Sequence, residues 1–207
     1  MAYDHDHDPE QEHGHDHEHE HEPEQDAEAL AEAQADAIRR HALAQIRQYP
    51  DVALRLAAKE LTDDDFDDDL RRLVERMERL MHEAQGIGLA ATQVGVLRRV
   101  FVFEPDDDGP RVVVNPRFVE RSDETAVEEE GCLSLQNVRV PVERAVRVTL
   151  AGRDLDGNEV QYELDGMGAR VAQHETDHLD GVLIIDRTDE EHRKRALGAL
   201  RPQPVLR

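Results

Sequence analysis

Two histidines late in the sequence have the spacing of metal ligands. His174 and His178 flank Glu175 in the run His174-Glu175-Thr176-Asp177-His178. In a helix, residues four positions apart lie one turn apart on one face, so both imidazoles can bind the same ion. Glu175 directly follows the first histidine and can reach a water molecule on that ion. The alternative is a solvated helix face, where two histidines also occur at this spacing by chance.

The only cysteine in the chain, Cys132, is the candidate for a third ligand. It lies in the run Glu130-Gly131-Cys132-Leu133-Ser134. A thiolate and two neutral imidazoles suit Zn²⁺ or Fe²⁺ in tetrahedral geometry, with the fourth position open for water. That is the layout of a catalytic site. The alternative for a lone cysteine is a small buried hydrophobic residue.

A third segment combines small residues with a side-chain amide, in Gly86-Ile87-Gly88-Leu89-Ala90-Ala91-Thr92-Gln93. Its glycines and alanines allow close approach of the backbone, but it does not follow a strand as a dinucleotide-binding loop would. Together, and in this order, the three segments resemble the motifs of the peptide deformylase family. The resemblance extends over residues 47–187.

This resemblance implies a metal-dependent hydrolase that removes the N-formyl group from the N-terminal methionine of newly synthesised polypeptides and releases formate. The residues that match the family's metal ligands are Cys132, His174 and His178. They would hold one divalent ion, natively Fe²⁺, with Zn²⁺ or Ni²⁺ able to replace it. Glu175 would take the proton of the attacking water and deliver it to the departing amine.

Further roles follow from the same resemblance. Gln93 and the backbone N–H of Leu133 look like the donors that stabilise a tetrahedral oxyanion. Gly88 and the backbone near Ile87 would bind the peptide main chain, and Arg139 matches a family arginine placed near the peptide.

The methionine pocket is expected to be shaped by Ile87, Leu89, Leu135 and His174. Gln136 stands where many relatives have proline, so the rim of this pocket is expected to differ. Two other functions stay open: a metal-delivery protein whose N-terminal segment is the active part, and a hydrolase of a different acyl substrate.

The helices and strands expected around these residues indicate an α+β fold. Antiparallel or mixed strands would surround a central helix that carries the His-Glu-x-x-His motif, and a C-terminal helix would follow. Strands are expected over 99–104, 111–120, 144–150 and 159–164, the last two joined as a hairpin across 156–158. An amphipathic helix is expected over 67–84, ending at a left-handed Gly86. A capping box of Thr188 and Glu191 would open the last helix, 189–200.

Charged residues are unevenly distributed along the 207-residue chain, whose formal net charge is −23. Residues 1–26 hold eleven acidic side chains, seven histidines and no Lys or Arg, which predicts a disordered tail. An Ala-rich helical linker (27–47), a catalytic domain (48–188) and a C-terminal helix and tail (189–207) would follow. The tail could bind extra metal ions weakly, the alternative being a solvated segment without that role.

Composition also bears on partners and location. A net-acidic chain is repelled by phosphates, which disfavours a general nucleic-acid binder. A local basic patch could still dock on the ribosome, or it could be a solvated helix face; it comprises Arg193, Lys194, Arg195, Arg201 and Arg207. One cysteine cannot form an internal disulfide, and neither a membrane span nor a signal peptide is recognisable. We therefore expect a cytoplasmic bacterial protein.

Overall fold

A computed structural model describes residues 23–106 and 109–200 of the chain, which divides into two units, Met1–Ala35 and Asp36–Arg207. Helix α1 (Pro23–Leu43) runs across that division. Its many alanines favour a helix, and proline is well tolerated at the first helical position. The helix begins inside the segment expected to be disordered and ends before residue 47. Residues 1–22 of the expected tail lie outside the described residues.

The larger sheet contains five antiparallel strands in the order β1-β2-β3-β6-β7. These strands are β1 (Gly88–Ala90), β2 (Val100–Phe103), β3 (Arg111–Arg121), β6 (Arg147–Arg153) and β7 (Glu159–Asp165). All four residues of β2 are buried, as its Val and Phe content predicts. Strands β6 and β7 form the predicted hairpin, with Gly157 at a φ of 83° in its turn. Strand β1 lies at one edge of this sheet.

A second sheet, which the sequence did not predict, pairs β4 (Thr125–Cys132) with β5 (Leu135–Ala145). Three consecutive glutamates in β4 hid its strand character, because acidic residues are rare in strands. The strand expected over 144–150 was wrong in its bounds: its first two residues end β5, and β6 begins at Arg147. The ladder shifts register between Gly131 and Cys132, next to the tip of this hairpin.

Helix α2 (Asp68–Glu83) buries the expected apolar stripe, and its N-cap Asp67 accepts a hydrogen bond from the Leu70 N–H. The predicted left-handed cap at Gly86 was wrong, since Gln85 adopts φ 59°. The Gly86 N–H instead donates to the Met81 carbonyl at 2.8 Å, which closes the helix end. Gly86 is needed for space: a Cβ there would lie 2.7 Å from Leu133 Cδ1.

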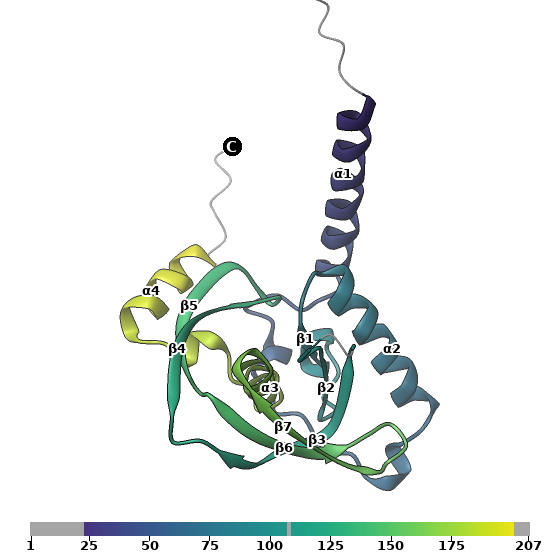
Figure 1. The fold of residues 1–207 in the computed structure, drawn as a ribbon, viewed down its shortest axis with the longest axis vertical. Helices are drawn as coiled ribbons and strands as arrows, with labels where there is room; N and C mark the ends of the chain where they lie inside the picture. The colour runs from purple at the N-terminus through teal and green to yellow at the C-terminus, as the bar shows by residue number, and fades with distance from the viewer. Residues whose placement is uncertain (1–22, 107–108, 201–207) are drawn as a thin grey trace, which may run out of the picture. The chain divides into compact units, whose positions relative to one another are not determined.

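Helix α3 (Gly166–Leu179) lies in the middle of the domain and contacts strands of both sheets (Figure 1). Helix α4 (Glu190–Ala199) packs on β5 and buries Ala196. Its N-cap is Asp189, which accepts from the His192 N–H, so the capping box predicted at Thr188 was wrong. None of the helices in the described ranges is long and apolar enough to cross a membrane.

Candidate metal centre

The three predicted ligands meet where the hairpin tip touches the central helix. Cys132 ends β4, and His174 and His178 lie one turn apart on α3. Their ligand atoms all lie within 4.8 Å of one another, and Cys132 Sγ is 3.2 Å from His178 Nε2. One thiol sulfur and two imidazole nitrogens at these separations fit a single divalent ion.

Protonation of the two imidazoles is set by their surroundings. The Nδ1 atom of His174 lies 3.0 Å from Glu130 Oε2, which leaves Nε2 for an ion. Burial opposes a charge on His174, but hydrogen bonds with Cys132 and Glu130 outweigh it and raise the pKa of His174 well above its usual range. Burial, together with the nearby His174, lowers the pKa of His178 well below that range, which favours the neutral imidazole at His178.

Glu175 projects from α3 into the same space. Its side chain is buried, and Oε2 has no hydrogen-bond partner within the described parts of the chain. Burial raises the pKa of Glu175 to about 7, against the opposing influence of His174. A Cβ on Gly88 would lie 2.4 Å from Glu175 Oε1 and 2.8 Å from Val171 Cγ1. Only glycine at position 88 leaves room for this carboxyl group, which can exchange a proton near neutral pH.

The amide of Gln93 is held in a fixed orientation. Gln93 belongs to a short 3-10 helix (Ala91–Val94), and its Oε1 accepts from the Ala90 N–H at 2.8 Å. The Nε2 group is therefore turned toward the site, where it donates to Ser134 Oγ at 3.2 Å and lies 3.8 Å from Cys132 Sγ. The amide thus presents a donor beside the candidate ligands.

Leu133 joins the hairpin tip to the other motifs. Its carbonyl accepts from Gln48 Nε2 at 2.9 Å, and its side chain packs over Gly86. The next residue, Ser134, donates its backbone N–H to Cys132 Sγ at 3.4 Å. The turn between β4 and β5 therefore holds both the cysteine and the Leu133 backbone against the segment that begins at Gly86.

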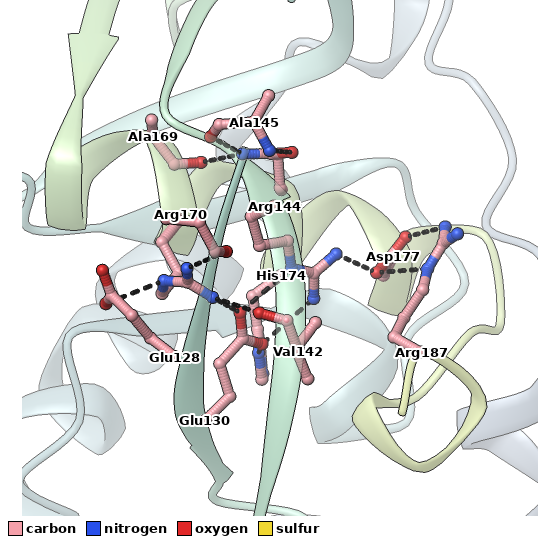
Figure 2. Close-up of polar contacts among 12 residues, drawn as sticks. Glu128, Glu130, Val142, Arg144, Ala145, Ala169, Arg170, His174, Asp177 and Arg187 are labelled. Carbon is pink, nitrogen blue, oxygen red and sulfur yellow. Dashed lines mark hydrogen bonds and ion pairs between the residues drawn. The ribbon is translucent and has the colours of Figure 1, made fainter. Parts of the chain in front are cut away.

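A chain of buried ion pairs supports His174, and the sequence analysis missed it (Figure 2). Glu130 accepts from Arg144 Nε and Nη2, both at 3.0 Å, and from Arg170 Nη1 at 2.7 Å. Arg144 also donates to Asp177 at 2.5 Å, and Arg187 binds Asp177 from outside at 2.6 and 3.1 Å. The sequence did contain one signal for these ion pairs. Two of the motifs each include an acidic residue without another assigned role, Glu130 in the cysteine motif and Asp177 in the histidine motif.

The acidity of Glu130 reflects these partners. Burial would raise its pKa, but hydrogen bonds from His174 and Arg144 outweigh burial and lower it to about 2. A carboxylate that stays ionised beside Nδ1 fixes which nitrogen of His174 faces the ion. Glu130 lines a cavity of about 680 Å³, and Arg144 lines another of about 410 Å³.

The larger cavity contains most of the predicted substrate residues. Ile87, Gly88, Leu135, Gln136 and Arg139 line it together with the candidate metal ligands Cys132 and His174. Leu89 was wrongly expected to shape this pocket. It is fully buried in the core that α2 forms, and it does not line the cavity.

Comparison with known proteins decides the family. The sequence pattern described as polypeptide deformylase matches residues 43–194. The chain belongs to the polypeptide deformylase family. As a member of that family it is a metal-dependent hydrolase that removes the N-formyl group from nascent polypeptides.

Individual deformylases are similar over most of their length. Peptide deformylase 1 of Corynebacterium glutamicum is 44% identical over 163 residues, which are 77% of this chain and 95% of that protein. The crystal structure of the Thermotoga maritima peptide deformylase is 46% identical, has a TM-score of 0.67 and covers 70% of this chain and 96% of its own. The Ehrlichia chaffeensis deformylase in complex with actinonin is 32% identical, with a TM-score of 0.73 over 78% and 98% of the two chains.

Proposed function

We propose that the chain carries out deformylation at one divalent ion held by Cys132, His174 and His178, with Glu175 as the acid/base group. The observation that supports this most directly is the convergence of one sulfur, two imidazoles and a buried carboxyl group beside the larger cavity, which Cys132, His174 and Glu175 line. Fe²⁺ is the ion we propose as native, with Zn²⁺ or Ni²⁺ able to occupy the same donors. Such an ion acts as a Lewis acid that polarises the formyl carbonyl and lowers the pKa of water.

Glu175 moves the proton in this scheme. Its pKa of about 7 lets the carboxylate form accept a proton from the attacking water. The carboxylic acid that results returns the proton to the nitrogen of the departing amine, which must leave protonated. Gly88 supports this step because it lets the carboxyl group come close to β1.

Gln93 and Leu133 are proposed to stabilise the charge that develops on the formyl oxygen. The Gln93 amide is already oriented by the Ala90 N–H, so its Nε2 donor needs little rearrangement. The backbone N–H of Leu133, in the turn between β4 and β5, is the second proposed donor, and Leu133 lines the larger cavity.

The peptide is proposed to bind along β1. This strand lies at the edge of the sheet, so the backbone at Ile87 and Gly88 can pair with an extended peptide. The methionine side chain would enter between Ile87, Leu135 and His174, and Arg139 would face the following residues.

Formate release from a formyl-Met-Ala peptide tests the proposal, using anaerobically prepared Fe²⁺ or Ni²⁺ protein. We expect Glu175→Ala to abolish release, while Asp180→Ala, at the exposed C-terminal end of the same helix, keeps it. The matching acetyl peptide tests the alternative acyl substrate. Equal turnover by Glu175→Ala and wild type would contradict the assigned role of Glu175.

As a second proposal, the chain docks on the ribosome through α4. This proposal places the chain in the bacterial cytoplasm. The described part of the helix offers little free positive charge, because Arg193 pairs with Asp186 and Arg195 with Glu191. Lys194 makes no ion pair within the described ranges. Arg201 and Arg207 lie outside them. Salt-sensitive cosedimentation with ribosomes, lost on Lys194→Glu, would support docking. Extra metal ions on the histidine-rich tail, residues 1–26, likewise stay a proposal, testable by metal stoichiometry.

A further inference from the structure

Arg39 reaches the substrate cavity from outside the segment that matches the family. It lies on α1, four residues before the helix ends, whereas the family match begins at residue 43. The end of α1 is fixed to the domain, because Ala42, Leu43 and Ile46 are all buried in the core that α2 forms. Arg39 is therefore presented by an anchored helix turn rather than by a loose segment.

The cavity that Arg39 lines is the one that contains the candidate metal centre. Arg39 and Leu43 form part of the same wall as Gln85 and Gly86, which follow α2. Gln136, the second residue of β5, lines the cavity as well. Arg39 and Gln136, the position that departs from the family pattern, therefore line the same cavity.

Several charged residues line this cavity, and Arg39 is one of those that make no ion pair within the described ranges. Of the charged residues lining it away from the metal centre, only Arg39, Glu129 and Arg139 make no ion pair within the described ranges. Glu129 and Arg139 are diagonal neighbours on one face of the hairpin, since Gly131 is opposite Arg139 and Glu129 is two residues from Gly131. Glu129 thus offsets Arg139. Arg39 makes no ion pair within the described ranges, and Asp36, one turn earlier on the same helix, does not line the cavity.

We propose that Arg39 is a specificity-determining residue that favours substrates with an acidic side chain shortly after formyl-methionine. This inference rests on the proposed function of the cavity. A guanidinium group binds a carboxylate through two parallel N–H donors. In a chain with a net charge of −23, acidic peptides are otherwise repelled, so an arginine at the cavity that makes no ion pair favours their entry.

Matched peptides test this preference with the full-length, metal-loaded protein. The series is formyl-Met-Ala-X-Ser amide with Glu, Gln or Lys at X, together with peptides that carry X at the second or fourth position. We expect kcat/KM to be about two- to fivefold higher for Glu than for Gln at one of these positions, the size of an exposed ion pair. The difference should lie in KM rather than kcat and should shrink as salt is raised.

Variants at two neighbouring arginines distinguish a specific effect of Arg39 from a general effect of positive charge. Arg39→Gln should remove the preference for Glu over Gln, and Arg39→Glu should turn it into a preference for Lys. Arg40→Gln is the matched control, because Arg40 is exposed on the same helix turn but does not line the cavity. A preference unchanged by Arg39→Gln, or lost equally in Arg40→Gln, would overturn the proposal.

Binding of the deformylated peptides, measured by calorimetry, gives a readout that does not need turnover. Met-Ala-Glu-Ser amide should bind more tightly than its Gln counterpart in wild type but not in Arg39→Gln. If no formyl peptide released formate, the proposed function would fail, and this binding difference would still decide the role of Arg39.

Discussion

Replacing Glu130 with glutamine should destabilise the metal-free protein strongly and in a pH-dependent way. Glu130 is 5% exposed and accepts hydrogen bonds from Arg144 and Arg170, with His174 Nδ1 also in contact. Its pKa falls from an ordinary 4.5 to about 2 in the folded protein. That difference corresponds to about 3 kcal/mol, at about 1.4 kcal/mol for each pH unit. Removing one partner from a buried ion pair costs a similar amount, roughly 3–5 kcal/mol.

The sign of the pH dependence follows from the lowered pKa. A carboxylate whose pKa is lower in the folded state contributes its stabilisation fully above the unfolded value of 4.5. The contribution is then lost as the pH falls from 4.5 towards 2. The difference in unfolding free energy between wild type and Glu130→Gln should therefore be full at pH 6 and much smaller at pH 2.5.

Urea unfolding of the metal-free proteins at several pH values measures this difference. Glu128→Gln is the matched control, because Glu128 also binds Arg170 but is exposed, so its loss should cost less than about 1 kcal/mol. A second readout is metal affinity, which should fall roughly 10- to 100-fold in Glu130→Gln as His174 loses its partner. A difference below 1 kcal/mol at pH 6, or one that does not change between pH 6 and 2.5, would refute the reasoning.

Three more predictions concern the catalytic groups and their supports. Gln93→Ala should lower kcat about 10²–10³-fold with the fold retained by circular dichroism, and a smaller loss would argue against its role as an oxyanion donor. Gly88→Ala should abolish turnover, because the new Cβ would meet Glu175 at 2.4 Å and Val171 at 2.8 Å; full activity in steady-state assays would contradict that packing. Arg187→Gln should weaken metal binding, measured by competition with a chelator, by less than the roughly 10- to 100-fold expected for a direct partner of a ligand. Arg99→Gln, at an ion pair outside the chain of buried pairs, should not change metal binding.

The candidate metal ligands could be picked out from the sequence because two of them lie close together along the chain. His174 and His178 lie four residues apart on an apolar-patterned segment, and the single cysteine left one candidate for the third position. Helix α2 and the hairpin of β6 and β7 were likewise visible as regular apolar patterns. The chemistry of these parts depends on near neighbours along the chain.

The buried ion pairs were not predictable in the same way. Glu130, Arg144, Asp177 and Arg187 meet only because the hairpin of β4 and β5 docks on α3. The hairpin itself was missed, since acidic residues are rare in strands, although Glu130 is buried against arginines. Charged residues carry no periodic signal that tells a surface position from an internal ion pair. The left-handed residue that follows α2, Gln85, and the N-cap of α4, Asp189, each differed by one residue from the prediction, which is the usual uncertainty of caps.

The position of Cys132 has a consequence for how the domain holds together. The cysteine is 46 residues from His178, and the two belong to different structural units, the hairpin and the central helix. An ion that joins them acts as a removable cross-link, closing a long loop much as a disulfide does. By mass action, free metal at 1,000 times its dissociation constant would add about 4 kcal/mol to the stability of the folded state. Metal supply would thereby govern how long the enzyme survives proteolysis as well as whether it is active.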